Sequence, residues 1–510
     1  MLPSAPSLRL SFSASLRLPA SPTPRLAVLL LFVAAVLLPL APLVHAAAPA
    51  ASALRAGAHA EDITPTTLPT PVNGGMKGAF AKAVTDPMFA RTVVVANGTT
   101  TLAFCIVDSC MIPREVCEAA KTLAAKATGI PAAHILISAT HSHSCATMTP
   151  VFQSEPDPAY VAALPARIAA GITRAHANLE PAEIAWAKDA DPAQVFNRRW
   201  HVKPGESYEN PFDSKADRAW MNPGFLNPKT TAPTGPVDPD VVVLAARARA
   251  DGRPLAVLAN YSLHYVGGNP ALSADYFGAF ARELAARLAP AGDPRYAGKP
   301  PFVGLMSNGT SGNINNVNYA APPPPRRAPG EQIGVVARSV ADAALRAWAK
   351  LAWQSSAPLA AAERDLTLGV RKPAPAELDR AKNIVATFKR DADGQFSDRK
   401  AIYALESLAL AAYPATVPVK LQAHRLGGLT VAAIPCEVFV EIGLELKAAK
   451  PLAEHFTISL ANGYNGYLPT PEHHALGGYE TWRARSSYLE VDASPKITAA
   501  LRELLAQVAR

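Results

Sequence analysis

Two histidines stand at alternate positions after an apolar run of residues. The segment 135–147 reads Ile-Leu-Ile-Ser-Ala-Thr-His-Ser-His-Ser-Cys-Ala-Thr, so His141 and His143 follow a stretch typical of a buried strand. In extended backbone, side chains at i and i+2 point to the same face, which brings both imidazoles toward one ion or one substrate. Neutral imidazole binds zinc, among other metals. The pair therefore predicts half of a metal site, with two solvated loop histidines as the alternative.

Other candidate residues share this position at the end of an apolar run. His264 follows one run and Glu437 another, and three tyrosines follow a third: Tyr464, Tyr467 and Tyr479. Ligands in mixed sheets often bind where strands end. Each residue also has an ordinary explanation, as a core histidine, a carboxylate in the first turn of a helix, or tyrosines that pack a loop. Their common position favours a functional role.

The elements that must position these residues are a mixture of strands and helices. Hairpins are predicted for residues 92–95 with 101–107 through a tight Asn-Gly turn, 241–250 with 255–263, and 418–425 with 430–434. Further strands are predicted at 302–306 and 457–461, and helices at 114–127, 157–177, 332–351, 376–389, 399–412, 436–449 and 494–508. Proline-rich stretches at 203–239 and 321–329 predict long surface loops. The expected fold class is α/β, with a mixed β-sheet core flanked by helices.

The first 46 residues have the three parts of a secretory signal. Three arginines precede the apolar run 26–44, and small residues follow it at a cleavage point after Ala46. The apolar run is also borderline for spanning a bilayer, so an uncleaved anchor stays open as an alternative. We expect an exported protein, periplasmic or extracellular, in which residues 50–510 form a single large catalytic domain.

Charge and cysteine content exclude some classes of protein. The net charge of +8 is mild and comes with no basic run, so we expect no nucleic-acid partner, whereas a weak peripheral contact with anionic membranes stays open. The five cysteines have no Cys-x-x-Cys spacing, which argues against a zinc ribbon or a disulfide scaffold.

Several segments together resemble the neutral/alkaline ceramidases, zinc-dependent amidohydrolases that cleave the amide of N-acylsphingosine. The family's Thr-His-Thr-His-Ser-Gly-Pro is similar to residues 140–146, its Asn-Arg-Ser to 197–199, and its Pro-Gly-Glu to 435–437. The most specific element is a Tyr, two residues, Thr-Pro-Glu and a later Tyr-Glu. It is similar to the segment 467–472 followed by Tyr479 and Glu480.

The resemblance implies a zinc site and the residues around it. The implied zinc ligands are His141, His264, Glu437 and Tyr467, and the residues implied around the substrate carbonyl are His143, Arg198 and Tyr479. Zinc would lower the pKa of a coordinated water toward neutrality, so that this water attacks an amide. Tyr479, His143 or Arg198 would donate to the developing oxyanion, and a histidine would pass a proton to the leaving amine.

The chain also departs from the family pattern. Where ceramidases read Gly-Asp-Val-Ser-Pro-Asn, with a serine that has been assigned as nucleophile, this chain has Asn315 at the place of the serine. We expect no serine nucleophile, and we expect the family's additional C-terminal β-sandwich domain to be missing. Cys145 and Cys436 replace two family glycines beside ligand segments, which raises the hypothesis of a disulfide between them against two buried thiols.

The leading hypothesis is thus a zinc-dependent hydrolase that cleaves the N-acyl bond of a ceramide-like lipid by metal-activated water. One alternative is an amidase for smaller N-acyl compounds, such as an acylated amino sugar or amino alcohol. The other is a catalytically silent binding protein of the same fold. A groove for long acyl chains would favour ceramide, and a short polar groove the smaller compounds.

Overall fold

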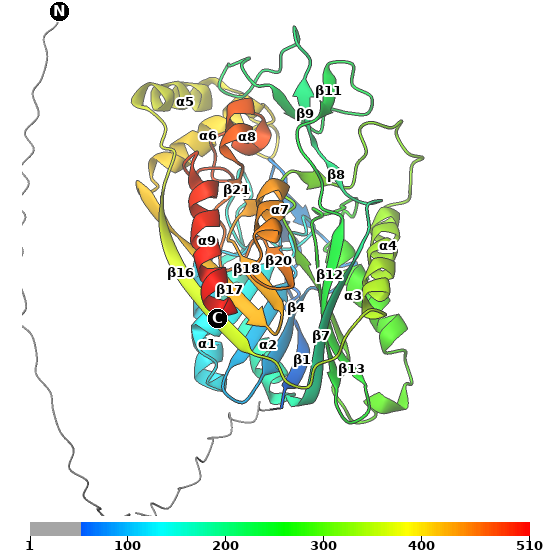
Figure 1. The fold of residues 1–510 in the computed structure, drawn as a ribbon. Helices are drawn as coiled ribbons and strands as arrows, with labels where there is room; N and C mark the ends of the chain where they lie inside the picture. The colour runs from blue at the N-terminus through cyan, green and yellow to red at the C-terminus, as the bar shows by residue number, and fades with distance from the viewer. Residues whose placement is uncertain (1–52) are drawn as a thin grey trace, which may run out of the picture. The chain divides into compact units, whose positions relative to one another are not determined.

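Two β-sheets stacked face to face form the centre of the molecule (Figure 1). The computed structural model describes residues 53–510, so the predicted signal segment, 1–46, lies outside the described residues. The larger sheet has the order β14 (Val303–Asn308), β13 (Pro254–Tyr261), β12 (Asp240–Ala248), β7 (Glu180–Ala190), β1 (Arg55–Asp62), β4 (Phe89–Ala96), β5 (Thr101–Val107) and β6 (Ile135–Ala139). The smaller sheet has the order β16 (Leu359–Gly369), β17 (Thr416–Leu426), β18 (Leu429–Ala433) and β20 (Glu454–Ile458).

Strand β5 shows why the larger sheet is apolar on both faces. Successive side chains of a strand point to opposite faces of the sheet. Leu102 and Phe104 pack in the core between the two sheets, whereas Ala103 and Cys105 pack in the core beneath helices. A strand covered on both faces reads as a continuous apolar run rather than an alternating one.

Helices cover the two outer faces of this pair of sheets. On the larger sheet lie α1 (Arg114–Thr128), α2 (Pro158–Ala177), α3 (Asp275–Leu288) and α4 (Glu331–Trp348). On the smaller sheet lie α7 (Val440–Ala448) and α9 (Ala493–Ala509), with α9 drawn in red across β16 and β17 in Figure 1. The layers therefore run helix, sheet, sheet, helix, and the predicted α/β class with a mixed sheet flanked by helices is confirmed.

Pairing in both sheets is mixed. β5 runs parallel to β6, β13 to β14, and β18 to β20, whereas the remaining pairs are antiparallel. The three predicted hairpins correspond to β4–β5, β12–β13 and β17–β18. The prediction of a tight two-residue Asn-Gly turn in the first hairpin was wrong. Ala96 pairs with Thr101, so four residues form the connection, and the Asn97 side chain accepts backbone hydrogen bonds from Thr99 and Thr100.

The start of the helix predicted at 436–449 was also wrong. Glu437 lies on the short strand β19 (Glu437–Val438), which pairs in parallel with β21 (Tyr467–Leu468), and α7 begins only at Val440. The Glu437 backbone N–H donates to the carbonyl of Gly466, 2.9 Å away. A distant segment thus provides the acceptor for a backbone N–H that the first turn of a helix would leave without an intrahelical partner, and Glu437 is not a first-turn carboxylate.

The proline-rich stretch 203–239 is only partly a loop. It contains β10 (Ala219–Met221) and β11 (Thr230–Pro233), which pair with β9 (Arg199–Val202) in a three-stranded sheet. The stretch 321–329 has no strand or helix and is mostly exposed, as predicted. Among the described helices, none combines the length and apolar character that crossing a bilayer requires.

The core between the sheets predicts a large effect of one truncation. Phe456 on β20 is fully buried there, so Phe456→Ala should lower the free energy of unfolding by about 3–5 kcal/mol through lost burial and a cavity. Phe80 on β3 (Ala79–Ala81) is 60% exposed, and Phe80→Ala should change that free energy by less than about 0.5 kcal/mol. Urea denaturation followed by circular dichroism measures both, and equal shifts would contradict this assignment of the core.

Candidate metal centre

Four segments far apart in the sequence bring the predicted ligands together. His141 follows β6, and His264 follows β13 by three residues. Glu437 and Tyr467 are register partners in the parallel pair β19–β21, so their Cα atoms face each other directly. These four side chains are buried, with 1–5% of each exposed. The site is therefore enclosed by the fold rather than displayed on a surface loop.

Three ligand atoms converge on one point. The His141 Nε2 atom lies 3.0 Å from the His264 Nε2 atom and 3.1 Å from Glu437 Oε2. His264 Nε2 lies 3.9 Å from the same carboxylate oxygen. Ligands around a tetrahedral zinc with bonds of about 2.0–2.1 Å are separated by about 3.4 Å. The spacing of the three atoms fits such a set.

Hydrogen bonds to backbone carbonyls fix the tautomers of both histidines. His141 Nδ1 lies 2.7 Å from the carbonyl oxygen of Cys110, and His264 Nδ1 lies 3.1 Å from that of Ser311. A carbonyl oxygen only accepts, so each Nδ1 carries a proton and donates it. In the neutral rings, each Nε2 therefore presents a lone pair to the same point, which is the arrangement of metal-binding histidines.

The chemistry of this donor set fits a cation. Among the described residues, Glu437 Oε2 is buried and receives no hydrogen bond, which is costly for a carboxylate oxygen. Two lone pairs and this oxygen would repel one another in a low-dielectric interior, and a divalent cation removes the repulsion. Two imidazoles and a carboxylate are a ligand set that zinc accepts.

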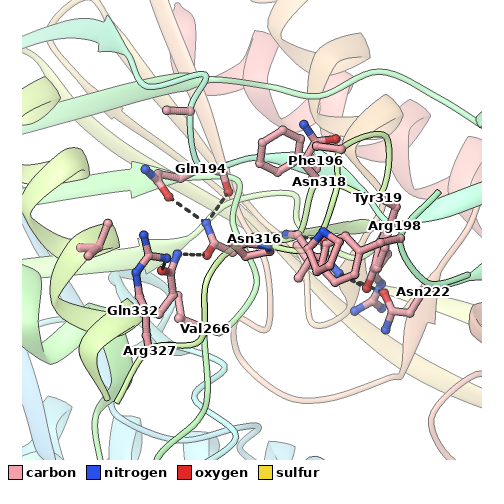
Figure 2. Close-up of a pocket in the computed structure, with 18 of the residues that line it drawn as sticks. Gln194, Phe196, Arg198, Asn222, Val266, Asn316, Asn318, Tyr319, Arg327 and Gln332 are labelled. Carbon is pink, nitrogen blue, oxygen red and sulfur yellow. Dashed lines mark hydrogen bonds between the residues drawn. The ribbon is translucent and has the colours of Figure 1, made fainter. Parts of the chain in front are cut away.

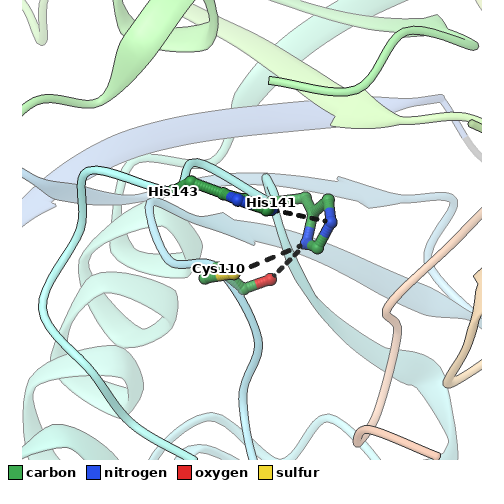
Figure 3. Close-up of side chains that lie close together, drawn as sticks. All are labelled: Cys110, His141 and His143. Atoms are coloured by element: carbon green, nitrogen blue, oxygen red, sulfur yellow. Dashed lines mark hydrogen bonds between the residues drawn. The ribbon is translucent and has the colours of Figure 1, made fainter. Parts of the chain in front are cut away.

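His143 lies beside this set, although the extended geometry expected for the pair was wrong. Strand β6 ends at Ala139, and His141 has a φ of 73°, a conformation that residues other than glycine rarely adopt. Figure 3 shows the result, with Nδ1 of His141 turned to Cys110 and Nε2 toward His143. The two Nε2 atoms lie 3.2 Å apart. A turn, not alternation along a strand, brings the two histidines together.

Two tyrosine hydroxyls are held beside the candidate ligands, one by Arg198 and the other by Glu437. Arg198 Nη2 donates to the Tyr467 hydroxyl, 3.1 Å away, and Arg198 Nε donates to Glu480 Oε1 at 3.0 Å. The Tyr464 hydroxyl donates to Glu437 Oε1 at 3.0 Å. Burial and then the neighbouring Glu437 raise the pKa of Tyr467 well above its usual value. Tyr467 therefore reaches the site as a phenol whose oxygen faces a guanidinium.

All seven predicted site residues meet in this region. Tyr479 lies beside His141, His143, Glu437 and Tyr467 around a small cavity of ≈ 20 Å³. A second cavity of ≈ 760 Å³ is lined by Arg198 and His264 on one side and reaches the proline-rich loop on the other (Figure 2). The site thus has a narrow part that holds the ligands and a wide part that opens beside it.

Some supporting residues could not be identified from the sequence. Tyr265 stacks on the His143 ring with centroids 3.6 Å apart, and a Cβ atom at Gly74 would lie only 2.4 Å from that ring. Gly74 therefore allows the close approach of the backbone to His143. In the sequence, only the Tyr479-Glu480 pair indicated that Glu480 lies near the site.

The disulfide hypothesis is wrong in the structure. All five cysteines are buried free thiols. Cys145 packs in the core beneath α1 and α2, and its thiol donates to the Ser273 carbonyl, whereas Cys436 packs in a separate core beneath α9. Burial is the main cause that raises the pKa of both thiols. The two residues flank the ligand segments on different sides.

Comparison with solved structures identifies the fold. The neutral ceramidase from Pseudomonas aeruginosa superimposes with a TM-score of 0.64 and 16% sequence identity, over 90% of this chain and 74% of that one. A ceramidase complexed with C2 gives a TM-score of 0.63 and 16% identity, over 90% and 75% of the two chains. The chain has a neutral ceramidase-like fold. No protein-family model matches the sequence, and no curated protein is significantly similar to it.

The donor set predicts how substitutions change zinc binding. His264→Ala removes one of three converging ligands and should abolish stoichiometric zinc. Tyr464→Phe removes only the hydrogen bond to Glu437 and should weaken zinc affinity about 10- to 100-fold. His176 lies on α2, away from the site, so His176→Ala is a matched control that should keep full affinity.

The measurement is zinc content by mass spectrometry after dialysis against a competing chelator. Equal zinc retention by the wild type and His264→Ala would contradict the assigned ligands.

Proposed function

We propose that this protein is an exported zinc-dependent amidohydrolase that cleaves the N-acyl bond of a ceramide-like lipid. The observation that carries the proposal is the convergence of His141 Nε2, His264 Nε2 and Glu437 Oε2 on one buried point. The ceramidase-like fold supports the choice of an N-acyl substrate. Tyr467, whose hydroxyl lies beside Arg198, completes the proposed ligand set.

The proposed roles follow from the positions of the side chains. Zinc, when bound, supplies the Lewis acidity that activates water for attack on an amide carbonyl. Arg198 and Tyr479 carry donors that stabilise negative charge developing on the carbonyl oxygen. His143 has its Nε2 on the side of His141 and the other candidate ligands, where it takes the proton that the attacking water loses and passes it to the leaving amine. Tyr265 stacks on His143 and holds its ring for this transfer.

A smaller N-acyl compound is the second candidate, and the wide cavity favours it. Side-chain amides contribute much of the lining beside Arg198 and His264, and they suit hydroxyl groups better than a long acyl chain. They are Gln194, Asn222, Asn315, Asn316, Asn318 and Gln332. An acylated amino sugar or amino alcohol is the matching class of substrate.

A panel of substrates separates these candidates. We expect ceramides or short N-acyl amines to be hydrolysed by the zinc-loaded protein, with activity lost on chelation and restored by zinc, because the ligands converge on one cation. His264→Ala should lose zinc and turnover together, whereas His176→Ala should keep both.

Release of the free amine, measured by mass spectrometry, reports turnover. Cleavage of short amides alone would support the second candidate. Absence of any cleavage by zinc-loaded protein would contradict the hydrolase and support a catalytically silent binding protein.

The residue at the place of the family serine provides a second test. The Asn315 amide donates to Asn222 Oδ1 at 2.9 Å, and its oxygen accepts from the backbone N–H of Val317, so it shapes the cavity wall. Asn315→Ala should keep kcat within about tenfold of the wild type, because loss of a nucleophile costs on the order of 10⁴ to 10⁶. Steady-state kinetics on the best substrate of the panel measures this. A loss of that larger size would contradict the metal-water route.

A further inference from the structure

The wide cavity carries an excess of positive charge that the proposed hydrolysis does not use. Arg198, Arg326 and Arg327 are in its lining, and no lining residue is acidic. Arg198 has an ion-pair partner, because Glu480 Oε1 lies 3.0 Å from its Nε atom, although Arg199 shares this carboxylate. Arg326 and Arg327, in contrast, have no ion-pair partner among residues 53–510. The cavity lining therefore includes two exposed guanidinium groups that have no ion-pair partner in the described chain.

Arg327 is the first member of a directed chain of hydrogen bonds along the cavity wall (Figure 2). Its Nη1 donates to Gln332 Oε1, so the Gln332 amide nitrogen is free to donate to Asn316 Oδ1 at 2.6 Å. Asn316 Nδ2 then donates to Gln194 Oε1 at 2.9 Å. This chain orients each amide and holds one edge of the Arg327 guanidinium, which leaves its other N–H groups for a ligand.

The loop that carries the two arginines is stiff for its length. Four prolines in succession, 322–325, precede Arg326, and Pro329 follows Arg327 by two residues. Proline fixes φ and lowers the conformational entropy that a loop loses when it binds a ligand. All four of these successive prolines line the cavity. The guanidinium groups are therefore presented by a segment that loses little freedom on binding.

The opposite end of the cavity leads to the proposed metal centre. In Figure 2, Arg327 and Arg198 stand at opposite sides of the lining, with Asn316 between them. A cavity of ≈ 760 Å³ holds a group of the size of a sugar or a lipid head group. A substrate with its amide beside Arg198 and His264 would place a distal group near the arginine pair.

We propose that the cavity binds an anionic group of the substrate, a phosphate, sulfate or carboxylate, through Arg326 and Arg327. The substrate class is then an N-acyl compound with a negative charge distal to the scissile amide. Guanidinium groups match such oxyanions by paired hydrogen bonds, and the amide chain provides donors and acceptors for neutral hydroxyls between the two ends. The identity of the substrate as an N-acyl compound rests on the proposed function, whereas the anion site itself rests only on the cavity.

Binding to metal-stripped protein tests the anion site without turnover. Calorimetry would compare two pairs of probes: N-acetylglucosamine 6-phosphate with N-acetylglucosamine, and short-chain ceramide 1-phosphate with the same ceramide. In at least one pair the phosphorylated member should bind about 10- to 100-fold more tightly, because hydrogen bonds to charged groups are worth about 1.5–3 kcal/mol. The pair that shows the preference identifies a soluble or a lipid source of the anion.

Substitutions test whether the two arginines cause the preference for the phosphorylated probe. The double variant Arg326→Gln with Arg327→Gln should remove the preference, so that the charged and neutral members of each pair bind with equal affinity. Arg338 is exposed on α4 outside the cavity lining, so Arg338→Gln is a charge-matched control that should keep the preference. Equal binding within both pairs, or a preference that survives in the double variant, overturns the proposal.

The amidase activity is read separately, from amine release by the zinc-loaded protein with the same four probes. Phosphate-dependent binding without hydrolysis would support the anion site and contradict the hydrolase. Hydrolysis with equal KM for charged and neutral members would support the hydrolase and overturn the anion site.

Discussion

The site depends on one electrostatic constraint: a buried carboxylate oxygen faces two imidazole lone pairs. Glu437 Oε2 receives no hydrogen bond from the described residues, and carbonyl groups hold the protons of both His141 and His264 on the far side of the rings. A buried carboxylate oxygen without a hydrogen-bond donor is costly in the protein interior. The fold therefore brings together two imidazole nitrogens and a carboxylate oxygen in an arrangement that a bound cation would stabilise. The short strands β19 and β21 contribute to this arrangement, because their pairing holds Glu437 beside Tyr467.

A second buried network sets the charge next to this centre. Glu480 is fully buried and binds both Arg198 and Arg199, through Oε1 at 3.0 Å and Oε2 at 2.6 Å. Burial alone would raise the pKa of Glu480, but the two arginines lower it below its usual value, so the carboxylate stays ionised. One carboxylate for two guanidinium groups leaves a net positive charge beside Tyr467. That charge suits a site in which a phenol oxygen and a substrate oxyanion become more negative during reaction.

The candidate site residues could be predicted from the sequence, but the backbone conformations that bring them together could not. Hairpins with glycine in their turns and helices with clear periodicity could be predicted because those signals are local. The helices and strands that were missed have weaker patterns. Helix α3 has aromatic residues and Gly278 in its buried part, and β7 has its charged residues at irregular spacing rather than in alternation with apolar ones. The start of α7 was misplaced because Glu437 pairs with a strand thirty positions later. The left-handed turn at His141 has no signal in the residue type.

Asn315 lies in the wall of the wide cavity. The serine at this place in the ceramidase pattern has been assigned as a nucleophile. The asparagine of this chain instead forms hydrogen bonds with its neighbours in the cavity wall. Its amide group binds Asn222 and the backbone of Val317, and Asn316 next to it joins the chain that ends at Arg327. The candidate metal ligands do not include this segment, which forms part of a polar wall. A substitution in this wall would therefore act first on which substrate is held, because Asn315 and Asn316 lie on a different segment from His141, Glu437 and Tyr467.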